Sequence, residues 1–220
     1  MYLFRGDMAS LPYLSGHGLE NSFAVVSAAE PPTPRTPEEA ADLCRDAGVD
    51  GLLVHEQGEA GRPFMRIFNA DGSEPEMCGN GLRVFARYLV EKHGASPELL
   101  EIETPAGLRR ARVEPGGPKE PWQVEVEMGR AVMARDAVGL EGAGPCHELR
   151  FELDVEGEPV TVSGAAVSVG NPHLVLFGGD GWADPRRATA LAAAIDEAGA
   201  FAKGVNLSLA EPHDHSEIKL

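Results

Sequence analysis

The stretch from Phe68 to Arg87 constrains this chain more than any other. It reads Phe-Asn-Ala-Asp-Gly-Ser-Glu-Pro-Glu-Met-Cys-Gly-Asn-Gly-Leu-Arg-Val-Phe-Ala-Arg. The apolar run 64–68 predicts a strand, and the segment after it, rich in Gly, Pro and acidic residues, predicts a loop. Apolar periodicity then returns and predicts a helix from about 80 to 93. Cys78 is therefore expected where the loop becomes the helix.

A cysteine at a helix start has unusual chemistry. The first turn of a helix has free backbone N–H groups and the positive end of the helix dipole, which together stabilise an anion such as a thiolate or a bound carboxylate. Cys78 is therefore a candidate base or nucleophile. Gly79 and Gly81 have no Cβ, so a ligand can approach their backbone closely. The alternative is that Cys78 is a small buried core residue, which is the usual role of a free cysteine.

The motif from Phe68 to Gly81 closely resembles the signature of the diaminopimelate epimerase family. These are cofactor-independent amino-acid epimerases of lysine and cell-wall precursor synthesis. The resemblance implies an α+β fold with two pseudo-symmetric lobes, each a curved mixed sheet wrapped around a central helix. It also implies an isomerase that converts LL-diaminopimelate to meso-diaminopimelate by thiol acid/base proton transfer.

The same resemblance assigns roles within the motif. Cys78 would be a catalytic acid/base, and the backbone of Gly79, Asn80 and Gly81 would cradle the reacting α-carboxylate. Asn69 would bind the amino-acid substrate, and Glu76 would line the site.

A second matching segment lies near the N-terminus. His17-Gly-Leu-Glu-Asn-Ser-Phe is similar to the family's His-Gly-x-Gly-Asn-Asp-Phe, in which the first Asn binds substrate. Asn21 takes that role by position, whereas Glu20 and Ser22 depart from the family pattern. Without the resemblance, Asn21 is interpreted as a turn residue, which is the commoner role of Asn beside Gly.

Two further segments match in the second half of the chain. Gly170-Asn-Pro-His resembles a family motif whose Asn binds substrate and whose His lies at the active site, which assigns Asn171 and His173. On their own these residues are equally consistent with a turn between strands. Asn206, in Lys203-Gly-Val-Asn-Leu, is likewise identified as a substrate-binding residue by resemblance.

Composition excludes several classes of partner. The formal net charge of -16 argues against nucleic-acid binding, which requires clustered Lys and Arg. No apolar run approaches membrane-spanning length, and three unpaired cysteines favour a reducing compartment, so we expect a cytoplasmic protein. Cys146-His147 has no second pair at zinc spacing and no phosphate-binding motif appears, so neither a metal nor a cofactor is expected. The expected partner is a small amino-acid substrate, and the resemblance is compatible with a homodimer.

We expect residues 1–15 to be a leader or a short extra element, 16–129 to form the N-terminal lobe, and 130–220 to form an incomplete C-terminal lobe. Thr36 and Glu39 form a capping-box pattern that predicts a helix ending at Gly48. Alternating segments predict hairpins over 99–113 and 149–162, and an Ala-rich segment predicts a helix over 185–201.

The family continues beyond the point that matches Leu220, into a segment with a second catalytic cysteine. Inversion at an α-carbon needs two acid/base groups, one on each face. The sequence is therefore expected to be a fragment, a truncated gene product, or a chain whose site another chain completes. Two alternatives to the epimerase remain: a catalytically inactive amino-acid-binding or partner-binding remnant, and a related isomerase of another amino acid.

Overall fold

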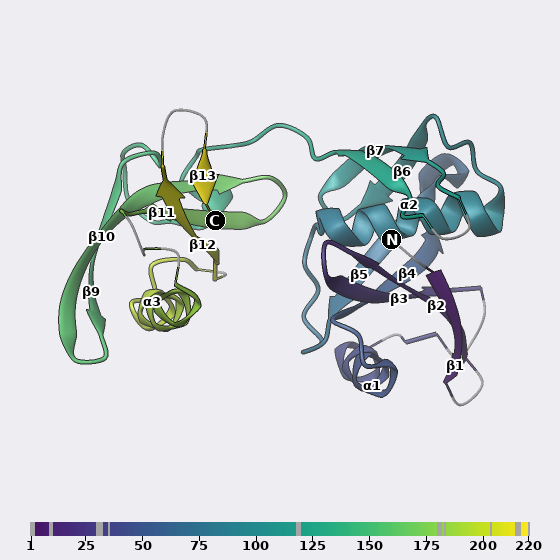
Figure 1. The fold of residues 1–220 in the computed structure, drawn as a ribbon, viewed down its shortest axis with the longest axis horizontal. Coiled ribbons are helices and arrows are strands. Elements are labelled where there is room, and N and C mark those ends of the chain that lie inside the picture. Colours follow the sequence, from purple (N-terminus) through teal and green to yellow (C-terminus); the bar gives the residue numbers. More distant parts are fainter. Residues whose placement is uncertain are drawn as a thin grey trace. The chain divides into compact units, whose positions relative to one another are not determined.

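The computed structural model describes residues 3–8, 11–29, 33–34, 36–117, 120–179, 182, 184–202, 204–213 and 217–219. The chain divides into two compact units, Met1–Met128 and Gly129–Leu220 (Figure 1). The division predicted from the sequence lies one residue later, after Gly129.

The first unit contains one mixed sheet with its strands in chain order, β1 to β8. Strand pairs β3–β4 and β5–β6 are parallel, and the other neighbouring pairs are antiparallel. The elements are β1 (Leu3–Met8), β2 (Leu11–Gly18), β3 (Asn21–Ser27), α1 (Pro37–Ala47), β4 (Gly51–Gln57), the short η1 (Glu59–Gly61), β5 (Pro63–Asn69), α2 (Gly79–His93), β6 (Leu100–Thr104), β7 (Gly107–Glu114) and β8 (Gln123–Glu127).

The first fifteen residues, expected to be a leader or a short extra element, contribute strands to this sheet. β1 pairs antiparallel with β2, and β2 continues through position 15 to pair with β3. The described residues of this segment therefore belong to the first unit and do not stand apart from it. The absence of a clear hydrophobic period hid these two strands, because period-two alternation is the signal from which a strand is predicted.

Side chains alternate between two cores on the two faces of this sheet. Val25 and Leu53 pack with residues of α2, whereas their neighbours Val26 and Leu52 pack with residues of α1. Figure 1 shows α1 and α2 on opposite sides of β3, β4 and β5. α2 is buried over most of its circumference, from Leu82 to Leu89 apart from one position, as expected of a helix enclosed by a sheet.

The ends of α1 and α2 follow from their sequences. The Thr36 side chain accepts from the Glu39 N–H, the Glu39 side chain accepts from the Thr36 N–H, and Gly48 closes α1 in the left-handed conformation. The predicted capping box is confirmed. Cys78 is the N-cap of α2, and Gly94, with φ of 62°, ends that helix.

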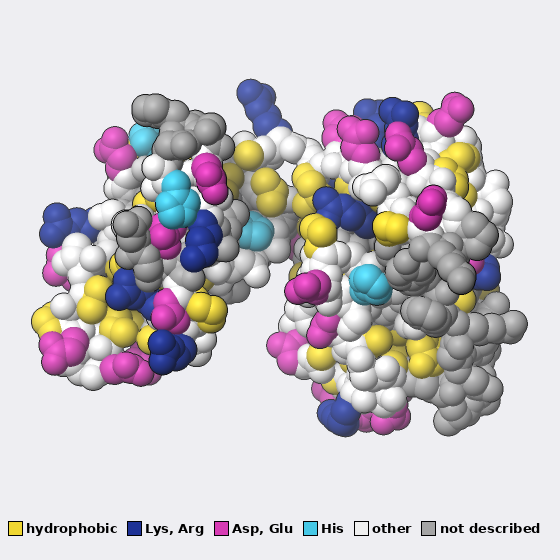
Figure 2. All heavy atoms as spheres, in the orientation of Figure 1, with side chains coloured by type: hydrophobic (Ala, Val, Ile, Leu, Met, Phe, Trp, Pro, Cys, Tyr) yellow, Lys and Arg dark blue, Asp and Glu magenta, His cyan; other side chains and the backbone are white. Residues whose placement is uncertain are grey.

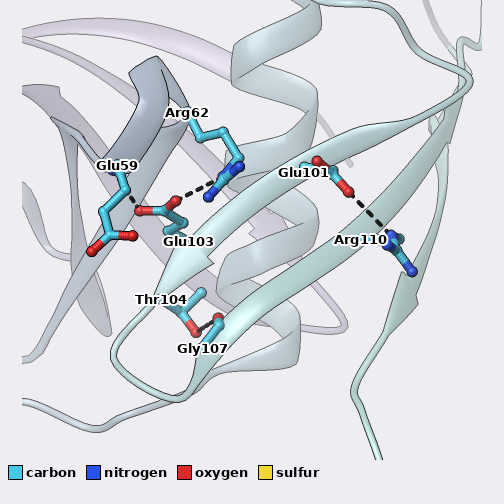
Figure 3. Close-up of polar contacts among 7 residues, drawn as sticks. All are labelled: Glu59, Arg62, Glu101, Glu103, Thr104, Gly107 and Arg110. Carbon is cyan, nitrogen blue, oxygen red and sulfur yellow. Dashed lines mark hydrogen bonds and ion pairs between the residues drawn. The ribbon is translucent and has the colours of Figure 1, made fainter.

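The β6–β7 hairpin is fixed by polar contacts along its edge (Figure 3). The carboxylate of Glu103 accepts from the Glu59 N–H at 2.8 Å and from Arg62 Nε at 2.7 Å. These contacts, which lower the pKa of Glu103, tie β6 to the segment before β5. Thr104 donates to the Gly107 carbonyl across the turn at 2.8 Å. The predicted hairpin is confirmed.

The second unit contains a five-stranded sheet in the order β13-β12-β11-β10-β9. α3 connects the parallel strands β11 and β12, as α1 connects the parallel strands β3 and β4, so the two units repeat one crossover. The elements are η2 (Asp136–Val138), β9 (Leu149–Val155), β10 (Glu158–Ser168), β11 (Pro172–Phe177), α3 (Pro185–Glu197), β12 (Asn206–Pro212) and β13 (Ile218–Lys219).

Two predictions for the second unit need correction. The predicted hairpin strand and the predicted strand after it are one continuous strand, β10, which pairs with β9 along its first half and with β11 along its second. α3 ends at Glu197 and not at Phe201, because Gly199 turns left-handed and Phe201 forms a bridge with Leu140.

The surface of each unit mixes both charge signs. In the view of Figure 2, acidic and basic side chains lie beside one another over both units. Arg110, for example, is 3.3 Å from Glu101 and 3.9 Å from Glu127. Among the described residues, no helix is long and apolar enough to cross a membrane.

Candidate functional site

Cys78 occupies the position that the motif predicted, at the beginning of α2. Its backbone is extended, and its carbonyl accepts the first helical hydrogen bond, from the Leu82 N–H at 2.9 Å. The Gly81 N–H donates to the Cys78 sulfur at 3.4 Å. The side chain is half-buried, so the sulfur combines access with the positive end of the helix dipole.

Three glycines allow other backbone and side chains to come close to this helix start. A Cβ on Gly81 would lie 3.1 Å from Leu53 Cδ2, and a Cβ on Gly79 would lie 3.1 Å from the sulfur of Met128. A Cβ on Gly18 would lie 3.1 Å from the backbone oxygen of Asn80. The absence of that Cβ lets the β2–β3 hairpin lie directly against the first turn of α2.

The hairpin presents Asn21 to the same place. Leu19 and Glu20 form its two-residue turn with φ of 50° and 72°, the left-handed pair that a type I′ turn requires. Asn21 then pairs with Gly18 at the start of β3. Asn80 Nδ2 donates to Asn21 Oδ1 at 2.7 Å, so the structure brings Cys78, Asn80 and Asn21 together.

Ser22, where the family pattern has Asp, holds the next part of the hairpin to β4. The Ser22 N–H and hydroxyl both donate to Asp50 Oδ2, at 2.7 and 2.8 Å, and the Asp50 N–H donates back to the hydroxyl at 3.1 Å. These bonds hold the pKa of Asp50 below its usual value. Ser22 therefore fixes the strand that follows Asn21.

Asn69 is the last residue of β5, and Glu76 lies on the loop that leads from it to Cys78. Asn69 Nδ2 donates to Ser73 Oγ at 2.9 Å, and Ser73 Oγ donates to Asp71 Oδ1 at 2.6 Å, so Asn69 is held in a turn of its own. The Glu76 carbonyl accepts from the Ala106 N–H at 3.1 Å, while the residue itself is exposed. Their roles toward a substrate remain predictions.

Asn171, His173 and Asn206 come together within the second unit. His173 Nε2 lies 3.0 Å from Asn171 Oδ1, which only accepts, so this nitrogen carries the hydrogen. Asn206 is the register partner of His173 on the neighbouring strand, and its Nδ2 donates to the Pro172 carbonyl at 3.1 Å. Burial lowers the pKa of His173, which favours the neutral imidazole.

The other two cysteines are core residues. Cys44 is fully buried, and burial together with nearby Asp50 raises the pKa of its thiol to about 11. Cys146 is 1% exposed and packs in the core of the second unit. Within the described ranges, no cluster of His, Cys, Asp and Glu has the arrangement of a metal site.

One residue of the site carried no role in the sequence analysis. Arg83 Nη1 donates to Asn80 Oδ1 at 2.9 Å. The spacing of three positions along a predicted helix could have paired these two side chains. Nothing in the sequence could have extended the pairing to Asn21, which is 59 positions away.

Comparison with known proteins supports the family resemblance that the motif around Cys78 indicated. The sequence profile described as diaminopimelate epimerase matches residues 13–134, more than half of the chain. The diaminopimelate epimerase of Moorella thermoacetica is 35% identical over 94% of this chain and 74% of its own length. The chloroplastic enzyme of Oryza sativa is 37% identical over 79% of this chain, and diaminopimelate epimerase 1 of Nostoc is 36% identical over 76%. The chain spans only 49% and 61% of those two relatives.

Solved structures show the same fold. A probable proline racemase from Agrobacterium radiobacter superposes with a TM-score of 0.60 at 15% identity, over 95% of this chain and 69% of its own. A predicted epimerase from Pseudomonas aeruginosa gives 0.52 at 17% identity, over 88% and 64%. At this identity the likeness concerns the fold alone, and the predicted α+β fold of two lobes is confirmed. The motif around Cys78, the profile match and the Moorella relative together show that this chain belongs to the diaminopimelate epimerase family.

Proposed function

We propose that this chain takes part in the cofactor-independent epimerisation of LL-diaminopimelate to meso-diaminopimelate. The observation that carries the proposal is Cys78 at the N-cap of α2, beside Asn80 and Asn21, within the residues that the family profile matches. A half-buried thiol at a helix start can exchange a proton with an acidic C–H bond held next to it.

The first turn of α2 offers backbone donors for the substrate's α-carboxylate. The Leu82 N–H is bonded within the helix and the Gly81 N–H faces the sulfur. Among the described residues, the N–H groups of Gly79 and Asn80 have no hydrogen-bond acceptor, so they can bind an anion at the positive end of the dipole. A carboxylate held there would place its α-carbon near Cys78, and the same groups would stabilise the negative charge that develops as the proton leaves.

Inversion needs a second acid/base group on the opposite face of the α-carbon. Cys44 and Cys146 are buried in apolar cores and do not meet this need. In this proposal Asn69 of the first unit binds an amino-acid substrate and Glu76 lines the site there. Within the second unit, Asn171 and Asn206 are substrate-binding residues and His173 is a site-lining residue. A homodimer in the cytoplasm belongs to the same proposal.

One competing function is a binding protein that holds an amino acid without inverting it. It is favoured because Cys78 is the single thiol identified at the site, whereas inversion needs two acid/base groups. The two functions differ in the stereochemical outcome. We would incubate the reduced chain with LL-diaminopimelate and resolve the stereoisomers by chiral chromatography. Formation of the meso isomer, lost in Cys78→Ala and kept in the matched control Cys44→Ala, would support epimerisation and would mean that a second acid/base group is supplied. Binding without formation of the meso isomer would favour the binding protein.

A further inference from the structure

Arg83 lies in the second turn of α2. It is the last of three hydrogen-bonded side chains, Arg83, Asn80 and Asn21, which we call the relay. Its Nη1 donates to Asn80 Oδ1 at 2.9 Å, and Asn80 Nδ2 donates to Asn21 Oδ1 at 2.7 Å. Among the residues that the structure describes, Arg83 has no acidic partner within ion-pair distance. Its charge is therefore directed at the amide of Asn80.

The direction of the hydrogen bonds in the relay follows from the chemistry of the guanidinium group. An arginine side chain has only hydrogen-bond donors, so the Asn80 atom that faces it must be the amide oxygen. The amide nitrogen of Asn80 then faces Asn21, and the Asn21 atom that meets it must also be an oxygen. A reversed amide at either residue would bring two donors together and leave a contact without an acceptor.

We propose that Arg83 is a positioning residue that orients the Asn80–Asn21 pair so that Asn21 presents its amide N–H groups to the ligand. A group with acceptors only, such as a carboxylate, would be bound there, and an ammonium or a carboxamide nitrogen would be disfavoured. This inference rests on the proposed function, because it states which part of an amino-acid substrate meets Asn21.

Two further features support a fixed orientation. Asn21 follows a two-residue turn and pairs with Gly18, whose missing Cβ brings the hairpin against the Asn80 backbone. Within the described residues, Asn21 Nδ2 has no acceptor, so its two hydrogens are available to a ligand. The unneutralised charge of Arg83 also favours an anion over a cation at this end of the relay.

The first test needs no ligand. In ¹⁵N-labelled chain, hydrogen exchange of the Asn80 side-chain amide would be measured in the wild type, Arg83→Met and Arg83→Lys. Lysine is also a pure donor, so Arg83→Lys should keep the slow exchange, whereas Arg83→Met should speed it at least tenfold. Equal exchange in the wild type and Arg83→Met would overturn the inference.

The second test measures ligand selectivity. Protection of Cys78 from iodoacetamide would be compared for diaminopimelate and for its monocarboxamide. A hydrogen bond to a charged group corresponds to about a tenfold to hundredfold preference for the carboxylate in the wild type. Arg83→Met should reduce this preference to about twofold or less, and Arg83→Lys should largely restore it.

Arg87→Met is the matched control for general damage to α2. Arg87 lies one turn further along, with its guanidinium carbon 4.5 Å from the ring centroid of Trp122, and is not part of the relay. Its replacement should leave the carboxylate preference unchanged. An unchanged preference in Arg83→Met would overturn the inference while the proposed function stands. A wild-type chain protected by neither compound contradicts the proposed function, and the exchange measurement still decides whether Arg83 orients the pair.

Discussion

The turn that presents Asn21 is strained, and relieving the strain should stabilise the first unit. Leu19 and Glu20 are both left-handed, with φ of 50° and 72°, a conformation that costs a non-glycine residue about 1 to 2 kcal/mol. The corresponding turn of the β9–β10 hairpin, Glu156-Gly157, has glycine at its second left-handed position. Replacing Leu19-Glu20 with Asn-Gly, the sequence that type I′ turns favour, should relieve most of this cost.

The net gain can be worked from the structure. Leu19 is 74% exposed, so its removal loses only roughly a few tenths of a kcal/mol of hydrophobic free energy. Glycine at position 20 adds unfolded-state entropy that costs about 0.5 to 1 kcal/mol. The double variant should therefore be about 1 to 2 kcal/mol more stable, which raises the urea midpoint by roughly 0.5 to 1 M.

The assay is urea unfolding followed by the fluorescence of Trp122, with Trp182→Phe as the background so that the first unit alone is observed. The control is Gln57→Gly, a glycine placed at an exposed strand position with ordinary φ, which should lower stability by about 0.5 to 1 kcal/mol. A midpoint for the Asn-Gly variant that equals or falls below that of its background would refute the reasoning about strain.

Three other predictions concern the first unit. Gly72→Ala should lower the thermal unfolding temperature more than Gly48→Ala does. Both residues are left-handed, but only at Gly72 would the Cβ meet a backbone oxygen, that of Pro37 at 2.7 Å. Equal losses of stability would show that this contact does not matter. His55 has its pKa lowered to about 4 by burial and by nearby His93, so the folded unit should lose about 1 to 2 kcal/mol as pH falls from about 6.5 to 4, after allowance for partial exposure. His55→Gln should flatten this pH dependence of urea unfolding, and an unchanged slope would contradict the assignment. Cys78→Ser should abolish α-hydrogen exchange yet leave thermal stability equal or slightly higher, since serine is a good N-cap, and a large loss of stability would show that the thiol is structural.

Features set by neighbouring residues could be predicted from the sequence. Thr36 and Glu39 are three positions apart, so the capping box of α1 was visible, and Gly48 marked its end. The beginning of α2 at Cys78 followed from the change between a loop composition and an apolar period. The capping box of α1 and the beginning of α2 both depend on residues that are only a few positions apart in the sequence.

Features that depend on distant partners could not be predicted. The first two strands have no clear period, and they exist because β2 pairs with β3 and β1 with β2. β10 was divided into two strands because its length is set by its two neighbours, β9 and β11. The orientation of Asn21 depends on Asn80, which the chain brings close only once the hairpin lies against α2.

The most direct test of the central claim, that Cys78 exchanges a proton with the α-carbon of the substrate, is hydrogen exchange at that carbon. The reduced chain would be incubated in D₂O with LL- and meso-diaminopimelate, and deuterium at each α-carbon would be followed by NMR. Our account predicts incorporation that is lost in Cys78→Ser and kept in Cys44→Ala. Incorporation that survives in Cys78→Ser, or none in the wild type while the substrate is bound, would contradict it.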